Sequence, residues 1–337
     1  MNLGAYILRR LLMLVPVLFG ALTLTFFVTR VIPADPVGAI LGPQAPPELV
    51  DKIRREWGFD KPLHEQFVNY ILGVVRGDWG RALRTGRPVL RDILEVFPAT
   101  LELATAALFV SVAVGVPLGL VAALKKDTWV DHVVRAFITI GSSTPAFWLG
   151  LMMLLLFYHR LGWLPGPGRL DTSIPPPPRI TGMVTIDSLL AGRFDAFANA
   201  VAHLVMPASV LGWISSAGIA RITRSSVLEV LSKEHVRAAR AKGLAEKLVV
   251  SRHVLRNALV PVVTVIGVTY GGLLEGAVMT ETVFSWPGLG RYSTNALLGL
   301  DYMAITGVTM FVALVYSIVN LATDVIYAYL DPRIRYG

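Results

Sequence analysis

Residues 11–29 read LLMLVPVLFGALTLTFFVT, a run without a charged side chain that directly follows Arg9 and Arg10. About 20 apolar residues are needed for a helix to cross roughly 30 Å of hydrocarbon at 1.5 Å per residue. The run is longer than the apolar region of a usual signal peptide, and no small-x-small cleavage site follows it. This stretch therefore predicts an uncleaved first transmembrane helix, and with it a membrane protein.

The composition of the whole chain supports this fold class. Of the 337 residues, 54% are hydrophobic and 16% are charged, and the mean hydropathy is +0.60. Soluble domains carry about a quarter charged residues. We predict an all-α integral membrane protein whose glycines Gly115 and Gly119 let two helices approach closely. Its six transmembrane helices are expected near residues 11–29, 101–124, 133–158, 200–220, 257–280 and 303–327.

The distribution of Lys and Arg predicts the orientation. The connections 1–10, 125–132, 221–256 and 331–337 together carry 15, whereas 159–199 and 281–302 together carry 5. We therefore expect both termini in the cytoplasm of a multi-pass protein of the cell inner membrane. The predicted regions are 1–30 (N-terminus and first helix), 31–100 (an extracytoplasmic helical loop) and 101–337 (a five-helix core that contains the cytoplasmic loop 221–256).

Several function classes lack the residues that they need. The chain has no cysteine, which excludes disulfides and thiolate metal sites. The net charge of +8 is explained by the basic cytoplasmic loops, so nucleic acid is not expected as a partner. No catalytic constellation of His, Asp, Glu or Ser lies within the predicted spans. An ion-coupled transporter or channel acting alone stays open as an alternative, although we see no repeat and only one acid well inside a span.

The most basic stretch is HVRAARAKGLAEKLVVSRHVLRN, residues 235–257. We predict a short helix over 233–242 with Ser232 as its N-cap, and Gly243 in the left-handed position after its end. A second helix is expected to begin near Ala245 and to continue into the fifth span. A helix this short is marginal alone in water, so it favours docking in a groove. A solvated loop near anionic lipid is the alternative.

This stretch resembles a known family. AARAKG followed by RHVLRNALVPVV is similar to the cytoplasmic loop of permeases in binding-protein-dependent ABC importers, whose pattern is Glu-Ala-Ala, three residues, Gly, nine residues, then Ile-x-Leu-Pro. Ala238, Ala239, Gly243 and Leu255 match this pattern, whereas the sequence departs from it at Arg237, His253 and Arg256. IPADP, GDWGRAL, FPATLELA, STPAFWLGL, ETVFSWPGLGRY and NLATDVIYAYLDPRIRYG resemble the dipeptide/oligopeptide/nickel permease subfamily.

The resemblance implies a transport subunit that works with other chains. No G-x-x-x-x-G-K-[ST] phosphate loop occurs, so we expect no cofactor on this chain, and ATP and Mg to be used by two separate ATP-binding subunits. A homologous second permease and an extracytoplasmic solute-binding protein are the other implied partners. The substrate class stays open among peptides, nickel chelates and oligosaccharides, with peptides favoured. The residues implied in ATPase coupling are Arg237, Ala238, Ala239, Arg240, Lys242, Gly243 and Leu244.

Two further places are candidates for the transport pathway. Glu275 is expected inside the fifth span, where a charged acid costs roughly 2.5–3.5 kcal/mol, and so faces a water-filled pathway or, protonated, a neighbouring helix. The resemblance makes the stretch at 281–292 an outer gate, with Phe284, Trp286, Pro287 and Gly288 as candidates; a rigid connection is the alternative. Glu102 and His203 are expected at span ends, Glu102 reaching the head groups and His203 in a packing role.

Overall fold

The computed structural model describes residues 3–30, 37, 45–56, 58–275 and 277–330. Within these residues helices are joined by turns and irregular segments, and the β-structure is one isolated bridge between Arg81 and Pro88. The helices are α1 (Leu3–Arg30), α3 (Pro47–Glu56), α4 (Leu63–Val75), α5 (Val89–Leu124), α6 (Trp129–Ser143), α7 (Ala146–Met153), α8 (Val184–Leu190), α9 (Phe194–Leu231), α10 (Glu234–Ala241), α11 (Glu246–Leu248), α12 (Leu255–Leu274), α13 (Val278–Val283), α14 (Leu289–Leu298) and α15 (Tyr302–Leu330). The expected all-α fold is confirmed.

Four helical segments are long and apolar enough to cross a membrane: α5, α9, the continuous stretch Glu246–Leu274, and Tyr302–Thr323 of α15. A bent pair, Trp129–Ser143 and Ala146–Arg160, makes a fifth if it is one span. Val15–Phe27, within α1, is a shorter apolar helix. Helices thus occur at all six predicted positions.

The third predicted span is not one straight helix. Its two halves meet at an angle of 99°, and Thr144 between them has extended backbone with ψ 125°. Pro145 follows, and the residue before a proline is pushed out of the helical region. The second difference lies in α5, which begins at Val89 and not near residue 101. Hydropathy did not detect this extension because residues 89–100 include charged side chains.

The helices α5 and α9 pack closely through glycine. A Cβ on Gly115 would lie 2.9 Å from the carbonyl oxygen of Ser216, and one on Gly119 would lie 2.5 Å from that of Ala220. Neither position has room for a side chain unless the backbone moves. The predicted role of these two glycines in close helix packing is confirmed.

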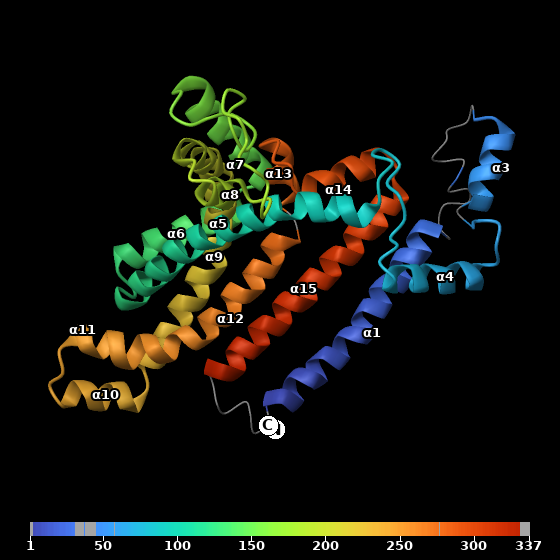
Figure 1. Ribbon diagram of the computed structural model, residues 1–337. Helices are drawn as coiled ribbons and strands as arrows, with labels where there is room; N and C mark the ends of the chain where they lie inside the picture. Colours follow the sequence, from blue (N-terminus) through green and yellow to red (C-terminus); the bar gives the residue numbers. More distant parts are fainter. Residues whose placement is uncertain (1–2, 31–36, 38–44, 57, 276, 331–337) are drawn as a thin grey trace.

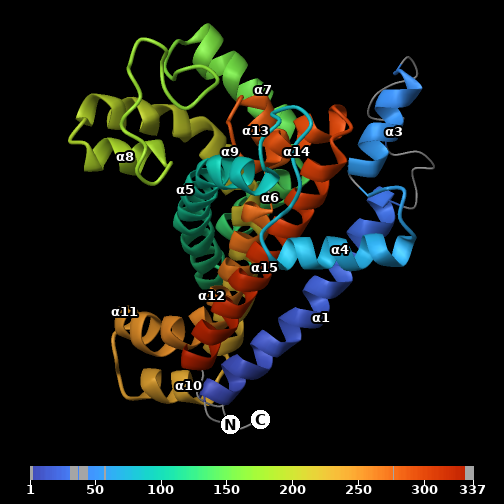
Figure 2. The same cartoon turned by 45° about the vertical axis from the view of Figure 1, so that its right-hand side comes forward.

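The bundle has two distinct ends (Figures 1 and 2). The α10 end carries α10 and α11, together with the first residues of α1 and the last of α15. The α13 end carries α7, α8, α13 and α14. Between them α12 packs against α9 and α15, and α15 packs against α1. The two candidate sites from the sequence therefore lie at opposite ends of the molecule.

Candidate functional site

The short basic helix and its glycine stop are present at the α10 end. Gly243 has φ +74°, and its N–H donates to the carbonyl of Arg240 at 2.9 Å. The N–H of Leu244 donates to the carbonyl of Ala239 at 3.4 Å. This pair of hydrogen bonds is the Schellman motif, in which a left-handed residue satisfies the last carbonyls of a helix. The predicted left-handed conformation of Gly243 is confirmed.

The start of the helix differs from the prediction. Lys233 is the N-cap of α10, whereas Ser232 is the C-cap of α9 and donates its hydroxyl hydrogen to the carbonyl of Glu229 at 2.7 Å. The predicted N-cap role of Ser232 is therefore wrong. The reason is that α9 continues to Leu231, which leaves Ser232 to end one helix and not to begin the next. The second helix starts at Glu246, as expected.

The seven predicted coupling residues divide between two faces. Ala239 is buried with Val236, and Leu244 is half-buried beside them. They pack on buried apolar residues of α5, α9 and the helix after α11, namely Ala123, Val227, Val230, Val249, Val254 and Ala258. The other predicted residues are exposed: Arg237, Ala238, Arg240, Lys242 and Gly243. A partner can contact this exposed set, while Ala239 and Leu244 hold the helix in place.

An ion pair fixes the angle of the loop. The Arg240 guanidinium donates to both carboxylate oxygens of Glu246, at 3.1 and 2.6 Å, across the turn at Gly243. The hydrogen bond from Arg240 lowers the pKa of Glu246, so the carboxylate stays charged at neutral pH. Bidentate pairs of this kind add geometric specificity. The loop thus presents a basic surface whose shape is set within the chain.

At the α13 end, Trp286 and Gly288 of the predicted gate residues contact α5. Phe284 packs on Met206 and Val210 of α9, and Pro287 is exposed. Phe284 and Trp286 are buried, and the indole N–H of Trp286 donates to the carbonyl of Ala99 at 2.8 Å. Gly288 lies so close to Glu281 and Thr100 that a Cβ there would collide with both side chains. We refer to residues 278–291 as the gate segment.

Sequence reasoning missed Glu281 within this segment. Its side chain is buried, accepts a hydrogen bond from the Thr100 hydroxyl at 2.8 Å, and accepts another from the backbone N–H of Arg291 at 3.0 Å. Burial raises the pKa of Glu281. The Thr100 hydroxyl oxygen also accepts from the N–H of Leu289 at 2.7 Å. A carboxyl in a predicted loop is expected to be solvated, so no sequence pattern indicated this contact.

The sequence analysis predicted that Glu102 reaches the lipid head groups, and this prediction is wrong. Glu102 is buried, and Arg169 donates to it at 2.5 Å from the connection between α7 and α8. The hydroxyl and backbone N–H of Thr185 donate to its other oxygen at 2.6 and 2.7 Å. The expectation failed because these partners lie far away in sequence. His203, in contrast, is buried and contacts Gly166 and Asp171, in line with a packing role.

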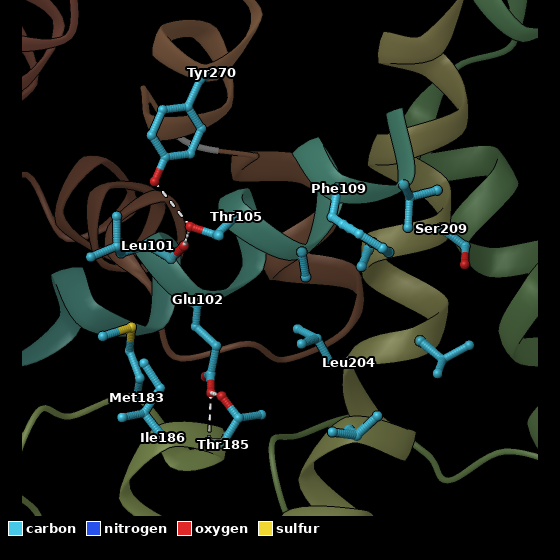
Figure 3. Close-up of a pocket in the computed structure, with 15 residues that line it drawn as sticks. Leu101, Glu102, Thr105, Phe109, Met183, Thr185, Ile186, Leu204, Ser209 and Tyr270 are labelled. Carbon is cyan, nitrogen blue, oxygen red and sulfur yellow. Dashed lines mark hydrogen bonds between the residues drawn. The ribbon is translucent and has the colours of Figure 1, made fainter. Parts of the chain in front are cut away.

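Glu102 and Thr185 also line a cavity of about 750 Å³ between α5, α8, α9 and α12. Its walls are mostly apolar, and Figure 3 shows the Glu102–Thr185 hydrogen bond and a second one at another side. There the hydroxyls of Thr105 and Tyr270 are 2.9 Å apart. Cavities that bind small molecules commonly have this volume and combine apolar walls with few polar groups.

Glu275 lies at the end of its helix and not well inside it. Helix α12 ends at Leu274, and Glu275 is the C-cap residue, with its N–H bonded to the carbonyl of Gly271 at 3.0 Å. Its side chain is exposed. Hydropathy misplaced it because the sequence stays apolar through residues 277–279. Among the described residues, no group of three or more His, Cys, Asp or Glu could hold a metal ion.

Comparisons with known proteins identify the family. The protein-family model described as "Binding-protein-dependent transport system inner membrane component" matches residues 115–336. The family model of the corresponding N-terminal region matches residues 3–104. The chain belongs to this family. It is therefore the permease of a binding-protein-dependent ABC importer, in which ATP hydrolysis resides in separate subunits.

Named relatives cover nearly the whole chain. It is 44% identical over 324 residues to the probable D,D-dipeptide transport system permease protein DdpB of Escherichia coli K12, covering 96% of this chain and 95% of that protein. It is 44% identical to the di/tripeptide permease DppB of Pseudomonas aeruginosa, over 98% and 99%. The glutathione permease GsiC of Salmonella choleraesuis is 37% identical, over 98% and 99%.

Solved structures support the same fold. The MetNI methionine ABC transporter in an inward-facing conformation matches with a TM-score of 0.52 and 19% identity, covering 71% of this chain and 96% of that one. At this identity the match shows the fold alone.

Proposed function

We propose that this permease imports di- or oligopeptides. The relatives named above are permeases for D,D-dipeptides, di- and tripeptides and glutathione, all of which contain peptide bonds. The cavity beside Thr105 and Tyr270 offers apolar walls for side chains and hydroxyls for peptide groups. Nickel chelates find less support, because the described residues offer no cluster of metal ligands.

The surface of the α10 end carries the coupling to ATP hydrolysis in this proposal. Arg237, Ala238, Arg240, Lys242 and Gly243 form its exposed face. The helix beneath is anchored by Val236 and Ala239. An anchored short helix transmits force as a rigid body, whereas a solvated loop would absorb it. The anchoring of α10 is the observation that supports its role in coupling, and it favours docking on a partner over binding to lipid.

The proposed complex contains this chain, a homologous second permease, two ATP-binding subunits that use ATP and Mg, and an extracytoplasmic solute-binding protein. The excess of Lys and Arg at residues 221–256 supports placing the α10 end and both termini in the cytoplasm. The α13 end and the region 31–100, which contains α3 and α4, then face the solute-binding protein. Glu275 and the gate segment would border the pathway between the two permeases.

The test is purification of the tagged chain from native membranes in mild detergent. We expect an ATPase, a second permease and a solute-binding protein to copurify, and peptide to stimulate ATP hydrolysis. Uptake into proteoliposomes should be inhibited by unlabelled dipeptide and not by nickel chelate. Purification of the chain alone, with solute transport but without ATPase activity, would refute the proposal.

A further inference from the structure

We propose that Arg169 is the positioning residue that latches the gate segment onto α5. The inference rests on the proposed outer location of the α13 end, and goes beyond it by assigning a role to a residue outside the gate. Arg169 lies in the connection between α7 and α8. Its guanidinium donates to Glu102 of α5 at 2.5 Å and to the carbonyl of Gly182 at 3.0 Å.

The same guanidinium lies over a gate residue. The carbon at its centre is 5.5 Å from the centroid of the Trp286 ring. A cation over the face of tryptophan is attracted by the ring, more strongly where water is excluded. Because Trp286 is itself bonded to Ala99, Arg169 covers the point where the gate segment meets α5.

Two independent sets of contacts therefore hold the gate segment on one turn of α5. In the first, Glu281, Thr100 and Leu289 are joined by hydrogen bonds, all within α5 and the segment itself. In the second, Arg169 brings in a third part of the chain, the connection after α7. A movement of that connection can withdraw Arg169 and release Trp286. The same connection also bonds to the segment directly, because the N–H of Gly168 donates to the carbonyl of Phe284 at 2.9 Å.

Loss of only one charge of the Arg169–Glu102 ion pair would destabilise the fold. The side chains of Arg169 and Glu102 are 15% and 4% exposed. Removal of one partner from a buried pair leaves the other charge uncompensated, which destabilises strongly. Replacement of both leaves no such charge. A double variant thus separates loss of the latch from failure to fold.

The absence of cysteine allows a direct measurement of opening. Thr280 in the gate segment is buried, and its hydroxyl has no hydrogen-bond partner among the described residues, so Thr280→Cys changes little. Thr223 in α9 is also buried, and its hydroxyl donates to the carbonyl of Ile219 in its own helix, so Thr223→Cys serves as a control away from the Arg169–Glu102 pair. The rate of maleimide labelling is measured for each in lipid nanodiscs.

We expect Arg169→Gln combined with Glu102→Gln to raise labelling of Thr280→Cys about tenfold or more, with Thr223→Cys unchanged. Arg169→Lys keeps the charge but not the forked geometry, and should give an intermediate rate. An unchanged rate at Thr280→Cys, or an equal rise at Thr223→Cys, would overturn the assignment. Labelling needs no ATPase, so this result is independent of whether the proposed partners copurify.

Discussion

Gly243 offers the sharpest test of the coupling surface. A Cβ built there meets no atom of the described residues within 4 Å, so the position has open space for the side chain of Gly243→Asp. The cost lies in the backbone, because φ +74° is unfavourable for a residue with a side chain by about 1–2 kcal/mol. A negative charge after a helix C-terminus adds about 0.3–1 kcal/mol. The total of about 1–3 kcal/mol is below the 5–15 kcal/mol of a folded domain, so the variant still folds.

We therefore expect the variant to insert at the wild-type level and still to fail in transport. A docked partner would enclose the new carboxylate, and an unpaired charge in an interface costs about 2–5 kcal/mol. This corresponds to at least a tenfold loss of coupling, at about 1.4 kcal/mol per factor of ten. Peptide uptake into proteoliposomes and peptide-stimulated ATP hydrolysis would both show it.

The chain contains a matched control for the backbone cost. Gly192 follows α8 with φ +67°, no atom near its Cβ position, and the same two hydrogen bonds, from Gly192 to Leu189 and from Arg193 to Ser188. Gly192→Asp carries an equal strain at the opposite end of the molecule and should transport normally. Equal transport by both variants, or equal loss in both, would refute the reasoning that Gly243 faces a partner.

Three further changes test other parts of the site. Glu246→Gln removes one half of the exposed ion pair with Arg240, and we expect at most about a threefold loss of peptide-stimulated ATPase activity. The pKa of Glu246 is lowered from 4.5, so the ion pair is intact above pH 4.5 and is lost only as the pH falls through the lowered pKa. Coupling by the wild-type chain should therefore be constant from pH 6 to 8. A pH profile with a step in that range would contradict this. Gly288→Ala inserts a methyl into filled space and should lower the free energy of unfolding by about 1–3 kcal/mol in a denaturation assay, whereas Gly218→Ala, with nothing within 4 Å, should not. Glu275→Gln should lower uptake or change its pH profile if the exposed carboxylate borders the pathway, and unchanged uptake at every pH would remove that role.

The parts of this molecule that the sequence predicted correctly depend on near neighbours. A membrane span requires only a long apolar run, and the glycine stop of α10 requires one left-handed residue after a helix. The bend at Thr144 has a local signal as well, since Pro145 follows it. We predicted one span here because transmembrane helices tolerate proline where neighbouring helices satisfy the freed carbonyls. Pro117 and Pro207 do lie inside helices. Proline marks a candidate bend, and packing decides whether the bend occurs.

The polar contacts at the α13 end join residues that are far apart in the sequence, and the sequence analysis did not predict them. Glu102 and Arg169 are 67 residues apart, and Thr100 and Glu281 are 181 apart. Periodicity and capping patterns extend over a few residues, so neither can detect such pairs. A buried carboxyl nevertheless requires a partner, because an unpaired one is expensive. For Glu102 and Glu281 the partners lie in distant segments of the chain, and in this permease those segments meet at the turn of α5 that contacts the gate segment.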